Sequence, residues 1–123
     1  MEDFVTYELA VKLKEKGFRR PCILYYNSDK VRTWFNEPYI AKNFIPTTLG
    51  NDDVLAPTIS QVLKWLREEK KIHIVIDFDS TMNWYYQIAL YGLTTYEKES
   101  KHKYNSYEQA VLAGIEYVLD KLI

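Results

Sequence analysis

Two carboxylates and two hydroxyls stand together where an apolar stretch of this sequence ends. Asp77 and Asp79 are two residues apart, and Ser80 and Thr81 follow directly. A spacing of two places both carboxylates on the same face of an extended strand. Side chains of these types supply nucleophiles, general acids and Mg²⁺ ligands in catalysis, but they also build ordinary strand ends and turns. The surrounding sequence must therefore distinguish a catalytic from a structural interpretation.

The segment DFDST at residues 77–81, after the apolar residues 72–76, resembles motif I of the haloacid dehalogenase-type phosphatases. The resemblance implies that Asp77 would be the nucleophile and Asp79 the acid/base, with Mg²⁺ neutralising the phosphate. That family also has a parallel sheet, a helix soon after the motif, and a later lysine and acidic pair. Here an aromatic strand follows almost at once, and the acidic pair at residues 52–53 precedes the motif. We therefore expect a polar strand end and turn without enzymatic activity, and a Mg²⁺-dependent phosphatase is the less favoured alternative.

The other reactive side chains show no spacing typical of a metal or redox site. His73 and His102 are the two histidines, and neither has a Cys or His companion two or four residues away. Cys22 is the single cysteine, which excludes an internal disulfide and is typical of a reducing, cytoplasmic compartment. The net charge of −1 argues against nucleic acid as the main partner. No apolar run approaches the about 18 residues of a membrane span, so we expect no cofactor, metal or membrane association.

The elements that would position these residues follow from hydrophobic periodicity. Residues 72–91 alternate apolar and polar side chains on two arms, which predicts a β-hairpin that turns at residues 80–83. A second hairpin is predicted over residues 22–36, and residues 39–45 are a further strand candidate. Apolar spacings of three and four, with capping residues before them, predict helices over 7–16, 58–70 and 107–122. The sequence thus predicts one α+β domain, residues 1–123, in two layers. A mostly antiparallel sheet of two hairpins would be covered on one face by three helices, in the order αββαββα.

Two details of the predicted helices refine this fold. Gly114 interrupts the apolar face of the last helix at a cost of about 1 kcal/mol relative to Ala, which a close approach to the sheet would explain. Residues 6–11 match residues 106–111 at five of six positions if Thr and Ser count as equal caps. Either two αββ units repeat, or capping rules alone produce similar helix starts.

The aromatic content is the most unusual feature of the composition, with 11 Tyr, 3 Trp and 5 Phe. On the helix-free face of the expected sheet, such rings would form a surface for another protein or a second copy, because Tyr and Trp commonly anchor interfaces. One alternative is stacking of single-stranded nucleic acid on the rings, although no RNP-like motif is present. The other is burial of the face beneath residues 37–55. The residues expected on this surface are Tyr25, Tyr26, Trp34, Tyr85 and Tyr91.

About half of the chain resembles a group of short uncharacterised proteins encoded by bacteriophages and prophages of gut bacteria. The resemblance is carried by residues 6–14 (TYELAVKLK), 56–58 (APT), 64–68 (KWLRE), 84–86 (WYY), 106–110 (SYEQA) and 113–115 (AGI). It implies a small accessory protein of phage type and carries no assigned activity. Because no complete catalytic constellation is present either, we expect a non-enzymatic protein-interaction domain.

Overall fold

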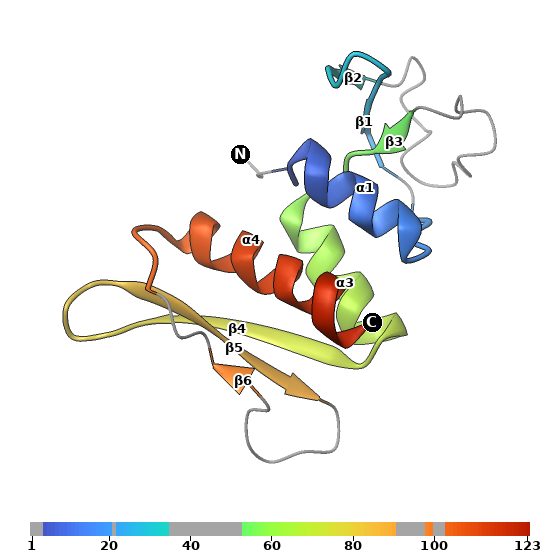
Figure 1. The fold of residues 1–123 in the computed structure, drawn as a ribbon. Helices are drawn as coiled ribbons and strands as arrows, with labels where there is room; N and C mark the ends of the chain where they lie inside the picture. Colours follow the sequence, from blue (N-terminus) through green and yellow to red (C-terminus); the bar gives the residue numbers. More distant parts are fainter. Residues whose placement is uncertain (1–3, 21, 35–52, 91–97, 100–102) are drawn as a thin grey trace. The chain divides into compact units, whose positions relative to one another are not determined.

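A computed structural model of the chain describes residues 4–20, 22–34, 53–90, 98–99 and 103–123. Within these residues the protein is α+β, with three α-helices and two small antiparallel sheets (Figure 1). Both predicted hairpins form, but each belongs to its own three-stranded sheet, so the expected single sheet of two hairpins is wrong. The chain gathers into two compact units, Met1–Gln61 and Val62–Ile123. The predicted strand at residues 39–45 lies outside the described residues.

The first unit combines helix α1 (Tyr7–Glu15) with a sheet in the order β2-β1-β3. Strand β1 (Leu24–Tyr26) pairs antiparallel with both β2 (Arg32–Trp34) and β3 (Val54–Leu55). The hairpin between β1 and β2 turns at Asn27, whose Oδ1 accepts hydrogen bonds from the backbone N–H groups of Asp29 (2.9 Å) and Val31 (3.1 Å). An Asn side chain that accepts backbone N–H groups in this way commonly stabilises a tight turn.

Helix α1 begins and ends as its sequence predicts. Thr6 Oγ1 accepts a hydrogen bond from the Leu9 backbone N–H at 3.2 Å, which satisfies a donor that has no partner within the helix. At the other end Gly17 adopts φ +88°, and the Phe18 N–H donates to the Leu13 carbonyl at 2.9 Å. A glycine in the left-handed region is the usual way to end a helix with this return bond. Leu9 and Leu13 are buried, so the apolar stripe belongs to the core.

The second unit is built on the long hairpin of β4 (Ile72–Phe78) and β5 (Trp84–Leu90). Strand β6 (Lys98–Glu99) pairs with β5, which gives the order β4-β5-β6. Helix α4 (Tyr107–Tyr117) continues as a π-helical turn over Val118–Leu122 and lies across one face of the hairpin (Figure 1). We call this face of β4 and β5 the helix-covered face and the opposite one the helix-free face.

Capping also fixes the starts of the other two helices. Helix α3 (Ile59–Glu69) is preceded by a reciprocal capping box. The Gln61 N–H donates to Thr58 Oγ1 (3.1 Å), and the Thr58 N–H donates to Gln61 Oε1 (2.8 Å). Helix α4 uses Ser106 Oγ as acceptor for the Gln109 N–H (3.2 Å), while Gln109 Oε1 accepts from the Asn105 N–H (3.1 Å). The predicted boxes are therefore confirmed, the second with its return bond moved by one residue.

Gly114 sets the distance between α4 and the sheet. A Cβ atom at this position would lie 3.2 Å from Ile74 Cγ2 and 3.2 Å from Tyr86 Cγ. Carbon atoms in ordinary contact stay about 3.5–4.0 Å apart, so only glycine lets the helix rest this close. The close approach inferred from the sequence is confirmed.

The similar helix starts at Thr6 and Ser106 occupy different places in the element order, because α1 precedes β1 whereas α4 follows β6. The third strand pairs with the first strand of the hairpin in the first unit and with the second strand in the second unit. The two starts share their capping chemistry, since Thr6 and Ser106 each accept the backbone N–H three residues later. No helix in the described part of the chain has the length and apolar character that crossing a membrane requires.

Candidate functional site

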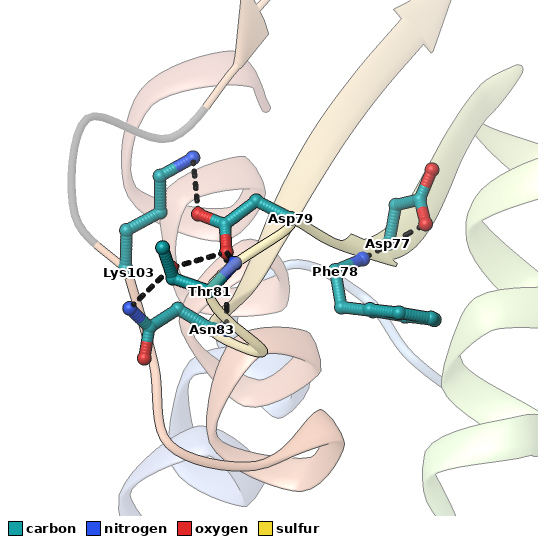
Figure 2. A network of polar contacts seen from close by, with 6 residues as sticks. All are labelled: Asp77, Phe78, Asp79, Thr81, Asn83 and Lys103. Carbon is teal, nitrogen blue, oxygen red and sulfur yellow. Dashed lines mark hydrogen bonds and ion pairs between the residues drawn. The ribbon is translucent and has the colours of Figure 1, made fainter.

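The paired carboxylates lie where β4 ends and the hairpin turns (Figure 2). The Asp79 N–H donates to the Asn83 carbonyl at 3.0 Å, and the Met82 N–H donates to the Asp79 carbonyl at 3.0 Å. Met82 takes φ +65°, a left-handed conformation that suits a tight hairpin. The segment is therefore the end of an antiparallel ladder, as the structural interpretation predicted.

The Asp79 carboxylate holds the turn together. Its Oδ1 accepts hydrogen bonds from the Thr81 hydroxyl (2.6 Å), the Thr81 N–H (2.9 Å) and the Asn83 N–H (3.2 Å). Its Oδ2 lies 3.8 Å from the Lys103 ammonium. The Thr81 hydroxyl bond, followed by the backbone bonds and the Lys103 charge, lowers the pKa of Asp79 below its usual value. Asp79 is thus an ionised residue whose carboxylate stabilises the turn by accepting hydrogen bonds.

Asp77 lies apart from this network. Figure 2 shows its carboxylate beside the Phe78 backbone, where Oδ1 accepts the Phe78 N–H at 2.8 Å. The side chain is exposed. Motif I of the phosphatases places its two carboxylates after a parallel strand, whereas β4 pairs antiparallel with the strand that follows it. Among the described residues, no group of three or more His, Cys, Asp or Glu side chains is placed to hold a metal ion.

Lys103 covers the one predicted aromatic residue that lies on the helix-free face of β5. Its ammonium sits 4.1 Å from the centre of the Tyr85 ring, within the range of a cation–π interaction. The same ammonium reaches Asp79, so Lys103 joins the turn to the sheet. Tyr85 is half-buried. A base that stacked on this side of the ring would first have to displace the Lys103 ammonium.

Tyr25 and Tyr26 differ in burial because neighbouring strand residues point to opposite faces. Tyr26 is only 5% exposed, and its hydroxyl donates to the Val5 carbonyl at 2.7 Å. Arg32 Nε in turn donates to the Tyr26 hydroxyl at 3.1 Å. Tyr25 is half-buried on the other face of β1. Tyr26 is thus a core residue, and its expected place on an exposed surface is wrong.

The five residues predicted for one aromatic surface are not on one sheet. Trp34 is 64% exposed on β2 of the first unit, whereas Tyr85 belongs to β5 of the second. Tyr91 lies outside the described residues. The helix-free face of a single sheet therefore does not collect these rings.

Most described aromatic rings of the second unit lie on its helix-covered face. Tyr86 stacks on Tyr104 with ring centres 6.4 Å apart and tilts against Tyr117 at 6.2 Å. Burial, with Tyr104 and Tyr117 nearby, raises the pKa of Tyr86. In the described part of the second unit, these rings thus help to pack α4 against the hairpin.

Three further aromatic residues, Phe78, Trp84 and Tyr107, lie beyond the buried core at the turn end of the hairpin. The sequence did not identify them as a candidate site. Phe78 and Trp84 pack with ring centres 5.2 Å apart, and Trp84 meets Tyr107 edge-on at 5.8 Å. Phe78 is 50% exposed and Tyr107 41%, while Met82 on the adjoining turn is 70% exposed. We call Phe78, Met82, Trp84 and Tyr107 the hairpin-end cluster. A signal was present: the alternation of β4 runs on to Phe78, opposite Trp84, whereas α4 begins only at Tyr107.

Cys22 takes no part in an exposed site. It is fully buried, and its thiol donates to the Arg20 carbonyl at 3.3 Å. Burial raises the pKa of the thiol to about 12, which keeps it in the unreactive protonated form. Cys22 is therefore a residue of the core.

No protein-family model, no curated protein and no solved structure matches this chain. The resemblance to proteins of phages and prophages therefore stays a prediction. The candidate site that the geometry offers is the hairpin-end cluster, because it gathers exposed apolar side chains on well-ordered elements.

Proposed function

We propose that this protein is a non-enzymatic interaction domain that binds a segment of another protein at the hairpin-end cluster. The supporting observation is the exposure of Phe78, Met82 and Tyr107, each between 41% and 70%. Covering apolar surface is favourable by roughly 25 cal/mol per Å². Adjacent large apolar groups left open on a small protein commonly mark an interaction surface.

Three aromatic side chains of the cluster contact one another before a partner binds. Trp84 is fixed by two backbone hydrogen bonds with Tyr104, at 2.8 and 2.7 Å. The rings of Phe78 and Tyr107 pack against Trp84 from β4 and from the first turn of α4. Because these side chains already hold their positions, a partner would order few new rotamers. Aromatic residues and Met are also enriched at the centres of protein interfaces.

The charges beside the cluster indicate the chemistry of the partner. Glu108 is exposed next to Tyr107, whereas Asp77 is exposed on the opposite face of β4, one residue before Phe78. The Lys103 ammonium is already engaged by Asp79 and Tyr85. A partner segment with apolar side chains and a Lys or Arg that reaches Glu108 would complement this charge, whereas a nucleic-acid backbone would meet like charge.

Selection from a displayed peptide library tests the proposal. The wild type and a triple variant, Phe78→Ser, Met82→Ser and Tyr107→Ser, would be compared after thermal melting shows that both are folded. Peptides enriched on the wild type should carry aromatic or aliphatic anchors with basic neighbours. Their affinity for the triple variant should fall at least about 30-fold, since single interface anchors are worth about 2 kcal/mol or more.

Trp34→Ser is the matched control, because it removes an exposed ring from the first unit. Equal binding of the selected peptides to the wild type and the triple variant would refute the site. Single-stranded DNA is the second probe. If an oligonucleotide quenched tryptophan fluorescence with a steep salt dependence, the nucleic-acid alternative would replace the present proposal.

A further inference from the structure

Strand β4 is the outer strand of its sheet. In the order β4-β5-β6, no strand of the described chain pairs with its other side. Seven residues long and without proline, β4 presents a regular edge. Such an edge is a template for another strand unless it is blocked by charge, a bulge or a covering segment.

The hydrogen bonds of the hairpin show which backbone groups point outward from β4. The Asp79 N–H bonds to Asn83, whereas the Trp84 N–H and carbonyl both bond to Tyr104. Trp84 therefore makes no ladder bonds to its register partner Phe78. Since bonded and non-bonded pairs alternate in an antiparallel ladder, the outward groups belong to the even-numbered residues. These are Ile72, Ile74, Ile76 and Phe78.

Asp77 already satisfies one of these outward groups. Its Oδ1 accepts the Phe78 N–H, which confirms that this N–H points away from β5. Strand pairing would replace this local bond with a carbonyl of the incoming strand and would release the carboxylate. The Asp77 carboxylate thus occupies the outward Phe78 N–H at the more exposed end of β4 and can be replaced there by a carbonyl of an incoming strand.

The sequence of β4, IHIVIDF, is complementary to its own reverse. When two copies are laid antiparallel about a two-fold axis at Val75, Ile72 stands opposite Phe78 and Ile74 opposite Ile76. His73 stands opposite Asp77, so an imidazole faces a carboxylate twice in the pair. The even-numbered residues exchange backbone bonds in this register, as their outward direction requires. A shift by two residues in either direction would leave part of each strand unpaired.

We propose that two copies of this chain associate by antiparallel pairing of β4 with β4, centred on Val75. The pairing joins the two sheets of the second unit into one continuous sheet and places His73 of each copy against Asp77 of the other. An imidazole opposite a carboxylate on either side of the axis, with apolar residues opposite each other between and beyond them, selects a second copy as the occupant. The inference goes beyond the proposed function, because it rests on the strand edge and on the helix-free face, away from Met82, Trp84 and Tyr107.

A charge-swap cycle tests the pairing by sedimentation velocity over a concentration series. His73→Glu puts two acids opposite each other, and Asp77→Lys puts a lysine opposite His73, so each should weaken self-association at least about 10-fold. The double variant His73→Glu, Asp77→Lys restores opposite charges and should recover association. Within one chain the two residues are about 13 Å apart along the strand at about 3.3 Å per residue. Recovery therefore cannot come from a contact inside one copy.

Gln87→Lys is the matched control, because it adds a charge at the β5 position paired with Val75 and away from the edge. Amide hydrogen exchange supplies a readout on the unmodified protein. Exchange at Ile74 and Ile76 should slow as concentration rises, while exchange at Val75 stays constant. A wild type that remains monomeric at millimolar concentration would overturn the proposal, as would a double variant as weak as the singles. Loss of peptide binding in a Met82→Ser, Tyr107→Ser variant with association intact would affect the proposed function alone, because neither residue belongs to β4.

Discussion

Replacing Gly114 by Ala tests whether the contact between α4 and the hairpin is as close as the structure places it. The added methyl would meet Ile74 Cγ2 and Tyr86 Cγ at 3.2 Å and Tyr86 Cβ at 3.3 Å. The Tyr86 atoms cannot easily withdraw, because they sit next to the backbone of the central strand β5. Its ring is also held between Tyr104 and Tyr117.

Two opposing effects set the magnitude. Ala is favoured over Gly inside a helix by about 1 kcal/mol, whereas forcing a methyl group into a packed core costs about 1–3 kcal/mol. Because the backbone-proximal atoms of Tyr86 cannot yield, we expect the steric cost to exceed the helical gain. Gly114→Ala should therefore lower the free energy of unfolding by about 1 kcal/mol.

Urea unfolding followed by circular dichroism measures this change, with equal m-values as evidence for a common two-state transition. Ala113→Gly on the same helix is the control and should cost about 1 kcal/mol through helix propensity alone. In an Ile74→Ala background, which removes one of the clashing atoms, Gly114→Ala should be less destabilising than in the wild type. A Gly114→Ala protein more stable than the wild type by about 1 kcal/mol would refute the close approach.

Three further predictions follow from buried or bonded polar groups. The thiol of Cys22, with its pKa raised to about 12, should react with a thiol reagent at pH 8 far more slowly in the folded protein than in urea; equal rates would contradict its burial. The pKa of Asp79 is lowered on folding, so its carboxylate stabilises the protein at neutral pH, and this contribution should be lost as the pH falls below about 4. Asp79→Asn should flatten the pH dependence of the melting temperature in that acidic range. An unchanged profile would show that the hydrogen bonds of the Asp79 carboxylate do not contribute to stability. Tyr26→Phe removes the hydrogen bond to the Val5 carbonyl and should cost about 1–3 kcal/mol, measured by urea unfolding beside the control Tyr107→Phe; equal stability of the two variants would contradict the role of that bond.

The local features of this protein could be predicted because they depend on a few neighbouring residues. Thr6 and Ser106 each accept the backbone N–H three residues later, so a side chain and its own helix suffice to define the start. The turn at Asp79 likewise uses bonds to residues two and four positions away. Gly114 indicated a close contact because glycine destabilises a helix interior, and close packing against a neighbouring element is one way to offset that cost.

The position of the candidate site could be predicted only in part. Alternation along β4 and β5 identified which residues share a face, and it placed Phe78 and Trp84 together. It did not show where α4 begins over that face, so the exposed end of the covered side was missed. The contact of the Lys103 ammonium with the Tyr85 ring could not be predicted from the sequence either, because the two residues are distant along the chain.

The sequence by itself determined the helices, the two hairpins and their turns, since periodicity and capping act over about one turn or one strand length. Only the tertiary structure decided that β3 pairs with β1 while β6 pairs with β5, which separates the hairpins into two sheets. Strand pairing of this kind joins backbone groups that every residue carries, so the side-chain pattern does not specify the neighbour. For the same reason only the structure could bury Tyr26, leave Phe78 half exposed and place β4 at the edge of the described sheet.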